Sequence, residues 1–103
     1  MAAASNDPSQ SLLFVLHHPL RRRLLRLYIE SEEPLSPKEL SDFTRQPLSN
    51  VGYHVRALTE HGAVELVETQ PRRGSVEHFY KATSLVPATP WALASLGLSP
   101  SDK

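Results

Sequence analysis

The polar side chains between Leu48 and Glu60 are spaced so that most of them share one side of a helix. At roughly 100° per residue, Ser49, Tyr53 and Arg56 point in one direction. This outward face holds small, hydrogen-bonding, aromatic and charged groups: Ser49, Asn50, Tyr53, Arg56 and Glu60, with Ala57 beside them and His54 nearer a flank. Their chemistry is recognition through hydrogen bonds, because base edges in the DNA major groove offer acceptors to arginine and donor–acceptor pairs to asparagine.

An apolar stripe on the opposite side has to hold this helix in place. Apolar residues recur there at steps of three, four and three positions: Leu48, Val51, Val55 and Leu58. We expect the whole stripe to face the core. Gly62 supplies the left-handed residue that ends such a helix. Gly52 costs roughly 1 kcal/mol relative to alanine in a helix interior. The close approach of another group to the helix explains this glycine best. Tight packing against the preceding helix is favoured over direct DNA contact as that approach.

A shorter helix is predicted immediately before this one. Its start signals are a hydroxyl cap, a proline that needs no N–H donor and a carboxylate that completes a capping box: Ser36, Pro37 and Glu39. Leu40 and Phe43 are its expected buried residues. Pro47 then interrupts this helix, because a proline disfavours helical conformation at the residue before it. The next helix restarts at 47 or 48. Two helices joined by so short a turn form a helix-turn-helix.

A basic hairpin is predicted after the helix-turn-helix. Residues 63–68 have an incomplete strand alternation, and a second strand follows over 76–82. The turn between them covers 70–75, where Gly74 supplies a positive φ. Its tip carries two adjacent cations, Arg72 and Arg73. They suit insertion into a minor groove or contact along its phosphates, although the need to solubilise a turn also explains them.

Three further helices complete one domain. Cap-and-proline pairs start the first and the last of them at 7–8 and 89–90, and Pro19 restarts the second. The helix after Pro19 has apolar residues on two sides, so it needs two packing partners. Trp91 and its apolar neighbours cover a core or a dimer seam. We expect a single domain over 8–97, with flexible tails at 1–7 and 98–103.

The charge is neutral in total and uneven in position. Eleven basic and eleven acidic residues argue against a polyanionic partner. However, Asp and Glu are absent from 8–29, 43–59 and 69–76, and those windows hold most of the arginines, so a locally positive surface is possible. Four arginines crowd the second helix: Arg21, Arg22, Arg23 and Arg26. They either support phosphate contact at the helix start, or form a solvated stripe or pair with Glu30 and Glu33.

The composition excludes several classes of function. No cysteine is present, so disulfides, thiolate metal sites and cysteine nucleophiles are excluded. The five histidines have no metal-ligand spacing on any one element, and no phosphate loop, nucleophile elbow or paired carboxylates in a plausible cleft emerge. We therefore expect no catalytic residues, no cofactor and no metal. The longest apolar run, Leu12 to Leu16, is far below a membrane span and the start lacks the basic region of a signal peptide, so we expect a cytoplasmic location.

Five segments, in this order and spacing, resemble the ArsR-like winged-helix regulators: HPLRRRLLRL at 18–27, LSPKEL at 35–40, LSNVGYHVRAL at 48–58, HGAVELV at 61–67 and GSVEHFY at 74–80. The resemblance covers about residues 11–83. It implies an intracellular prokaryotic regulator, usually a homodimer, that binds operator DNA with one recognition helix per half-site. Metal-sensing members use cysteine or paired histidine and acidic ligands, which this chain does not have at the matching places.

The residues and the resemblance together predict a mainly α fold with a small β-hairpin, a winged helix-turn-helix. We expect a sequence-specific DNA-binding transcriptional regulator, with a recognition helix of about 47–61 in the major groove and the wing, 70–75, on the minor groove or backbone. His54 is either a phosphate donor or a structural hydrogen-bond partner. The expected DNA-contacting residues are Arg45, Gln46, Ser49, Asn50, Tyr53, His54, Arg56, Arg72 and Arg73.

Two questions of partnership accompany this prediction. The first and last helices are the expected seam of a homodimer on double-stranded DNA, because both are apolar and lie outside the helix-turn-helix. The alternative is a winged-helix protein–protein interaction module without DNA binding, which docks a partner through Leu25, Ile29 and Trp91. Whether an effector ligand binds between subunits stays open.

Overall fold

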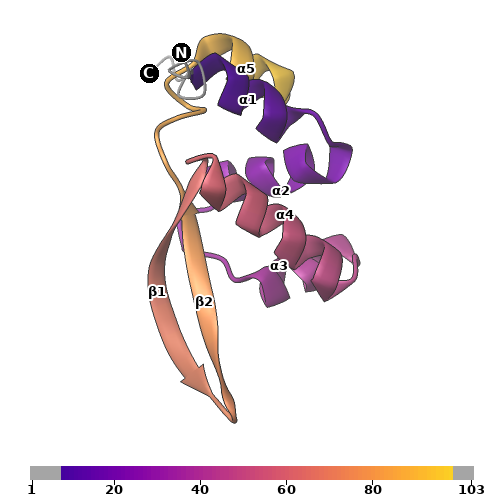
Figure 1. Cartoon of the computed structure of the whole chain (residues 1–103), viewed down its shortest axis with the longest axis vertical. Coiled ribbons are helices and arrows are strands. Elements are labelled where there is room, and N and C mark those ends of the chain that lie inside the picture. The colour runs from indigo at the N-terminus through magenta and orange to yellow at the C-terminus, as the bar shows by residue number, and fades with distance from the viewer. Residues whose placement is uncertain (1–7, 99–103) are drawn as a thin grey trace, which may run out of the picture.

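The computed structural model describes residues 8–98. In chain order the elements are α1 (Pro8–Leu16), α2 (Pro19–Glu30), α3 (Pro37–Thr44), α4 (Leu48–Glu60), β1 (Val64–Arg72), β2 (Ser75–Ala82) and α5 (Pro90–Ser95). Helices α1 and α5 lie side by side at one end of the molecule, and the β1–β2 hairpin projects from the other end (Figure 1). The predicted tails fall outside the described residues, except for Leu98, whose backbone N–H donates to the Leu93 carbonyl at 3.1 Å.

One hydrophobic core joins helices α1, α2, α4 and α5. Leu24 and Leu25 on α2 are fully buried, as are Val51 and Leu58 on α4. Helix α2 packs against α1, α4 and β2, which confirms that its two apolar sides have separate partners. Because Leu25 lies in this core, it cannot contact a docking partner, and that part of the interaction-module alternative is wrong.

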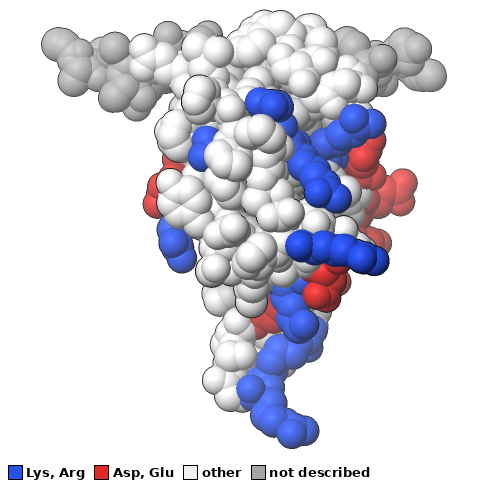
Figure 2. All heavy atoms as spheres, turned by 90° about the vertical axis from the view of Figure 1, so that its right-hand side faces the viewer, with Lys and Arg blue, Asp and Glu red and all other residues white. Residues whose placement is uncertain are grey.

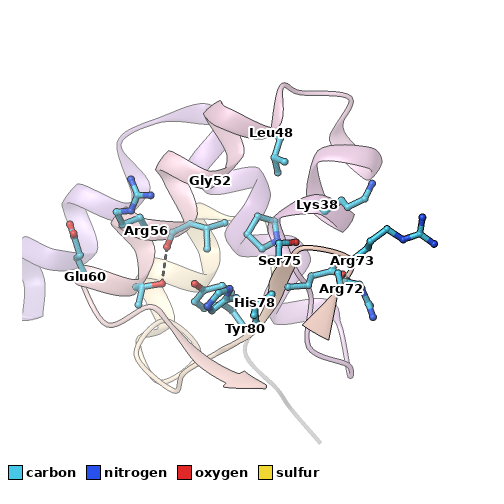
Figure 3. Close-up of a pocket in the computed structure, with 15 residues that line it drawn as sticks. Lys38, Leu48, Gly52, Arg56, Glu60, Arg72, Arg73, Ser75, His78 and Tyr80 are labelled. Carbon is cyan, nitrogen blue, oxygen red and sulfur yellow. Dashed lines mark hydrogen bonds and ion pairs between the residues drawn. The ribbon is translucent and has the colours of Figure 1, made fainter. Parts of the chain in front are cut away.

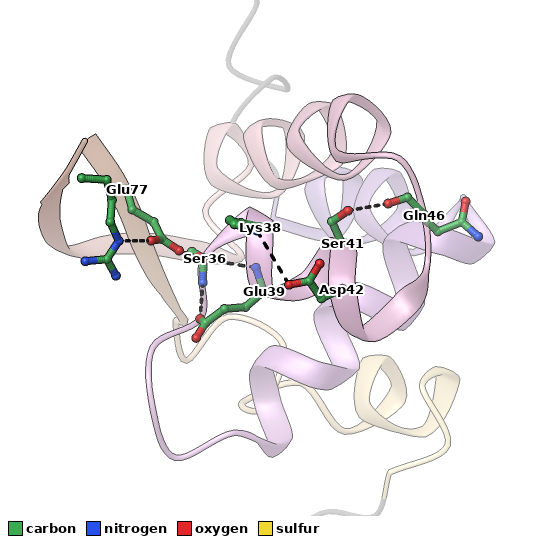
Figure 4. Close-up of polar contacts among 8 residues, drawn as sticks. Ser36, Lys38, Glu39, Ser41, Asp42, Gln46 and Glu77 are labelled. Carbon is green, nitrogen blue, oxygen red and sulfur yellow. Dashed lines mark hydrogen bonds and ion pairs between the residues drawn. The ribbon is translucent and has the colours of Figure 1, made fainter. Parts of the chain in front are cut away.

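The predicted start of α3 is confirmed atom by atom. The Ser36 hydroxyl accepts the backbone N–H of Glu39 at 3.2 Å, and the Ser36 N–H donates to the Glu39 carboxylate at 3.0 Å (Figure 4). Helix α3 ends at Arg45, which has the left-handed φ of +59°. Pro47 then caps α4, which begins at Leu48. This order of short helix, tight turn and longer helix is the predicted helix-turn-helix.

Three burial predictions in the helix-turn-helix are wrong. Phe43 is 61 % exposed, and Thr44 is buried in its place, with its hydroxyl donating to the Leu40 carbonyl at 2.7 Å. Leu48 is 52 % exposed, because the first turn of α4 borders the hairpin side of the molecule rather than the core. Ala57, which was placed beside the outward face, is buried. The direction of a side chain around its helix therefore does not by itself predict whether that side chain is buried near the helix ends.

The hairpin strands are longer than predicted. They pair antiparallel from Val64 with Ala82 at the root to Arg72 with Ser75 at the tip. The turn therefore shrinks from 70–75 to Arg73 and Gly74, where Gly74 has the expected positive φ of +77°. An irregularity in β1 between Leu66 and Glu68 accounts for the incomplete alternation in the sequence.

A backbone bridge ties the hairpin to the helical part. Leu35, in the loop before α3, exchanges two backbone hydrogen bonds of 2.9 Å with Tyr80 on β2. No local sequence pattern signals this pairing, because it depends on how the hairpin packs against the loop before α3. At the other end of the chain, α5 forms and Gly97 follows it with φ +78°. The hydroxyl of Thr89 donates to the Leu85 carbonyl instead of capping α5.

The arrangement of helices and two-stranded hairpin is a winged helix-turn-helix, which confirms the predicted fold class. The hairpin is the wing, and α4 occupies the position of the recognition helix between the wing and α2. Along residues 8–98 no helix is long and apolar enough to cross a membrane.

Candidate nucleic-acid interface

The outward face of α4 is exposed as predicted. Five of its residues are open to solvent: Ser49, Asn50, Tyr53, Arg56 and Glu60. Tyr53, the largest of them, is 58 % exposed. Because core side chains such as Val51, Val55 and Leu58 hold the opposite side of the helix, this face is a supported ridge with free hydrogen-bonding groups. Such a ridge has the diameter and the chemistry to enter a major groove.

His54 lies at the edge of this ridge but points inward. Its ring is 6 % exposed, and its Nδ1 accepts the Arg21 Nε–H at 3.4 Å. The ring centroid lies 4.4 Å from that of His18 and 5.1 Å from that of Tyr53. Burial, followed by the nearby His18 and Arg21, lowers the pKa of His54. The structural hydrogen bond is therefore the better of its two predicted roles, because it joins α4 to α2.

Most of the arginines on α2 are engaged by the ends of other helices. Arg21 is buried and donates to the Phe14 carbonyl at 2.5 Å, while Arg22 donates to the Leu16 carbonyl at 2.6 Å. Both carbonyls belong to the last turn of α1. Arg26 donates to the Leu96 carbonyl at 3.1 Å, next to α5, and to Glu30 at 3.3 Å. Arg23 is the remaining arginine of α2, and it is exposed.

The wing's two arginines have different surroundings. Arg72 donates its Nε–H to Glu77 at 2.7 Å, and the second Glu77 oxygen accepts the buried Ser36 hydroxyl at 2.5 Å (Figure 4). These two hydrogen bonds lower the pKa of Glu77, the one from Ser36 most. Arg73 is exposed in the turn and makes no ion pair within residues 8–98. The hairpin tip is accordingly cationic, as Figure 2 shows at its lower end.

The turn between α3 and α4 contributes two predicted contact residues. Arg45 is exposed. Gln46 is half-buried, and its carbonyl accepts the Ser41 hydroxyl at 2.6 Å, which leaves its side-chain amide at the surface near Asn50 (Figure 4). The turn therefore lies at the same end of α4 as Ser49 and Asn50.

Two hollows flank the α4 ridge. The wing-side hollow, between α4 and the hairpin, has a volume of about 710 Å³ and includes Lys38, Leu48, Gly52, Arg56, Arg73 and Val76 (Figure 3). The α2-side hollow, of about 500 Å³, is lined by His18, Pro19, Leu20, Arg23, Gln46, Asn50 and His54. Both hollows carry cationic side chains at their rims. The outward face of α4 is therefore bordered by one hollow on the wing side and by another on the α2 side.

The packing explanation for Gly52 is wrong. A Cβ atom built on Gly52 would meet no atom within 4 Å among residues 8–98, outside its own helical backbone and chain neighbours. The glycine instead borders the wing-side hollow.

Several contacts of the interface were missed from the sequence. The Ser36–Glu77 hydrogen bond joins positions 41 residues apart, and the Arg26–Leu96 contact spans 70. The acidic Glu77 close to the basic tip was a visible signal in the sequence for an ion pair with Arg72. Nothing in the sequence indicated its second partner, Ser36, which caps α3. Within residues 8–98, no group of three or more His, Asp or Glu side chains has an arrangement that would hold a metal ion.

Comparisons with known proteins agree with this geometry. The family model of the helix-turn-helix domain matches residues 16–67, slightly more than half of the chain. Among solved structures, reduced HlyU from Vibrio cholerae is similar, with a TM-score of 0.61 and 19 % sequence identity over 91 % of this chain and 86 % of that one. At that identity the likeness concerns the fold. No curated protein matches the sequence.

Proposed function

The chain belongs to the family of helix-turn-helix domains, and from this premise we propose that it is a sequence-specific DNA-binding transcriptional regulator. Helix α4 enters the major groove, and the wing contacts the adjacent minor groove or backbone. The observation that carries the proposal is the exposed α4 ridge, supported from behind by the core and flanked by two hollows with cationic rims.

The side chains divide into two kinds of contact. Asn50 and Arg56 are the base-reading residues, because their donors and acceptors match adenine and guanine edges. Phosphate contacts come from the turn and the wing, through Arg45, Arg73 and the outer nitrogens of Arg72. Ser49, Tyr53 and the Gln46 amide serve either purpose. His54 positions α4 from within.

A fluorescence anisotropy titration with DNA selected by the purified protein tests the base-reading residues. Asn50→Ala and Arg56→Ala should each weaken operator binding by about 1–3 kcal/mol and relax the preference for particular bases. Ser84→Ala, at an exposed site in the loop between β2 and α5, is the control and should bind as the wild type does. Unchanged affinity and preference in both variants would remove α4 from the reading of bases.

The finer classification is also a proposal. The five resembling segments and the winged fold support an ArsR-like regulator, which would act in the cytoplasm as a homodimer on a palindromic operator. Two recognition helices read such a site only if the dimer spaces them about one DNA turn apart. The exposed apolar side chains of α1 and α5, Leu13 and Trp91, support a seam at these helices.

A protein–protein interaction module without DNA binding is the second candidate. The observations that favour it are the neutral net charge and the same exposed Leu13 and Trp91, together with Ile29, which is half-buried on α2. A gel shift with random duplex at low salt separates the two functions, because electrostatic binding to any sequence should appear there for a DNA-binding protein. Absence of any shifted band would favour the interaction module.

A further inference from the structure

Nothing in the structure of residues 8–98 requires a glycine at position 52. It lies in the middle of α4, where glycine is roughly 1 kcal/mol less favourable than alanine. Its φ is not positive, unlike those of Gly62, Gly74 and Gly97. The described residues leave more than 4 Å of space around a Cβ placed there. Neither packing nor backbone conformation requires a glycine, so a partner that approaches α4 closely is the remaining physical reason.

The surroundings of Gly52 show where that partner would lie. The glycine borders the wing-side hollow (Figure 3), whose lining also includes Leu48 on α4 and Val76 on β2. Both of these side chains are 52 % exposed. Apolar surface of this kind, left open beside a backbone without a side chain, suits a partner with an apolar face that comes close to the helix.

The rim of the same hollow is cationic. Lys38, Arg56 and Arg73 lie around it, and the Lys38 side chain is 69 % exposed with only a 4.0 Å contact to Asp42. Of the two carboxylates in the lining, Glu77 is occupied by Arg72 and Ser36, and Glu60 lies at the far end of α4. The hollow therefore favours an occupant that combines an apolar face with negative charges.

A deoxyribose–phosphate strand has both properties. When a helix fills a major groove about 12 Å wide, a phosphate strand runs along each side of it. If the wing follows the neighbouring minor groove, the strand that separates the two grooves has to pass between α4 and the hairpin. That is the position of the wing-side hollow.

We propose that the wing-side hollow receives this DNA strand and that Gly52 is the point of closest approach. A sugar lies against Leu48, Gly52 and Val76, while Lys38 and Arg73 hold the flanking phosphates. The assignment rests on the proposed DNA binding and adds two residues, Gly52 and Lys38, that the sequence did not place at the interface.

The test is to fill the space beside Gly52 with larger side chains that leave the charge of the protein unchanged. Gly52→Ala and Gly52→Leu should raise the thermal unfolding midpoint, by about 4–8 °C for alanine, since the free chain has room for the side chain and gains helix propensity. The same variants should bind operator DNA more weakly, by about tenfold for alanine and more for leucine. Ser84→Leu, at an exposed site in the loop between β2 and α5 that lines neither hollow, adds bulk elsewhere and should leave affinity unchanged.

Salt dependence separates the steric effect from an electrostatic one. Gly52→Ala should shift the plot of log affinity against log salt downward without changing its slope, whereas Lys38→Gln should reduce the slope by about one. A stabilised Gly52→Ala that binds DNA like the wild type would overturn the proposal while DNA binding itself stands. A destabilised one would also overturn it, because the chain would then need the glycine. If the wild type binds no DNA duplex, the proposed function itself is contradicted, and the proposal for Gly52 is contradicted with it.

Discussion

At the scale of single residues, the pair His54 and Arg21 links the recognition helix to the body of the protein. The guanidinium of Arg21 lies 4.3 Å from the Phe14 ring centroid, donates to the Phe14 carbonyl and donates to the His54 Nδ1. Because a guanidinium stays protonated, His54 has to remain neutral to accept from it. This agrees with its lowered pKa.

His54 should make the stability of the protein depend on pH below neutrality. The pKa of its folded form lies below the ordinary value of 6.5, so the unfolded chain takes up the proton first. Stability is therefore complete above pH 6.5 and falls as the pH drops through and below it. Thermal unfolding of the wild type and of His54→Gln between about pH 5 and 8 should show a smaller loss in the variant. His78→Gln, at an exposed site on β2, is the control, and an equal loss in His54→Gln would contradict this role.

Residue-level prediction from the sequence worked where a local rule decided the outcome. The capping box at Ser36 and the positive φ of Gly62 and Gly74 follow from a few neighbouring atoms. It failed for Phe43 and Leu48, because helical periodicity gives a direction but not the position at which the neighbouring element ends. It also failed for the polar pairs, since the sequence does not show which distant residue lies opposite Arg21 or Glu77.

At the scale of elements, the wing is held at both ends. Its root is fixed by the Leu35–Tyr80 bridge, and further along β2 the Glu77 carboxylate joins the Arg72 side chain to the start of α3 through Ser36. The Ser36 hydroxyl serves two purposes, since it also caps α3. The backbone bridge and this one carboxylate thus together hold the wing against the helix-turn-helix.

Removing the charge of Glu77 should loosen the wing. The folded pKa of Glu77 lies below its ordinary value of 4.5, so its stabilising contribution is present above pH 4.5 and is lost as the pH falls through the lowered pKa. Glu77→Gln should therefore unfold at a lower temperature than the wild type at neutral pH, and the gap should close in acid. Glu65→Gln, on the exposed side of β1, is the matched control. A gap that persists unchanged in acid would contradict an electrostatic tether.

The elements themselves were largely predictable, and their lengths less so. Proline and glycine mark the limits of the helices in the sequence, which is why α1, α2, α3 and α5 begin at prolines. The hairpin gained residues at its tip because Pro71 tolerates an edge position opposite Val76. Its long-range bridge to Leu35 depends on how the hairpin packs, which no local pattern encodes.

At the scale of the whole molecule, helices α1 and α5 leave large apolar side chains exposed at the end opposite the wing. Leu13 is 62 % exposed on α1, and Trp91 is 46 % exposed on α5. They line one shallow hollow together with Leu16, His17, Arg22 and Ser95. Large apolar side chains left open on two adjacent helices are typical of a subunit interface.

Charge placed at this end should prevent the proposed dimer. Sedimentation velocity at micromolar concentration should show a dimer for the wild type and a monomer for Leu13→Glu and for Trp91→Glu, because a buried unpaired carboxylate is strongly unfavourable. Leu66→Glu, at a site 47 % exposed on β1, is the matched control and should sediment like the wild type. A monomeric wild type would contradict the seam, and so would a Trp91→Glu protein that stays dimeric.

The arginines of α2 have a consequence for the search along a chromosome. Arg21, Arg22 and Arg26 each donate a hydrogen bond to a carbonyl at the end of α1 or α5. The net charge of the chain is zero. In the proposed DNA complex, contact with arbitrary sequence therefore falls to cations of the helix-turn-helix and the wing such as Lys38, Arg45 and Arg73, and encounters with non-specific DNA should be brief. Selectivity then comes from a low background as much as from tight binding at the correct site.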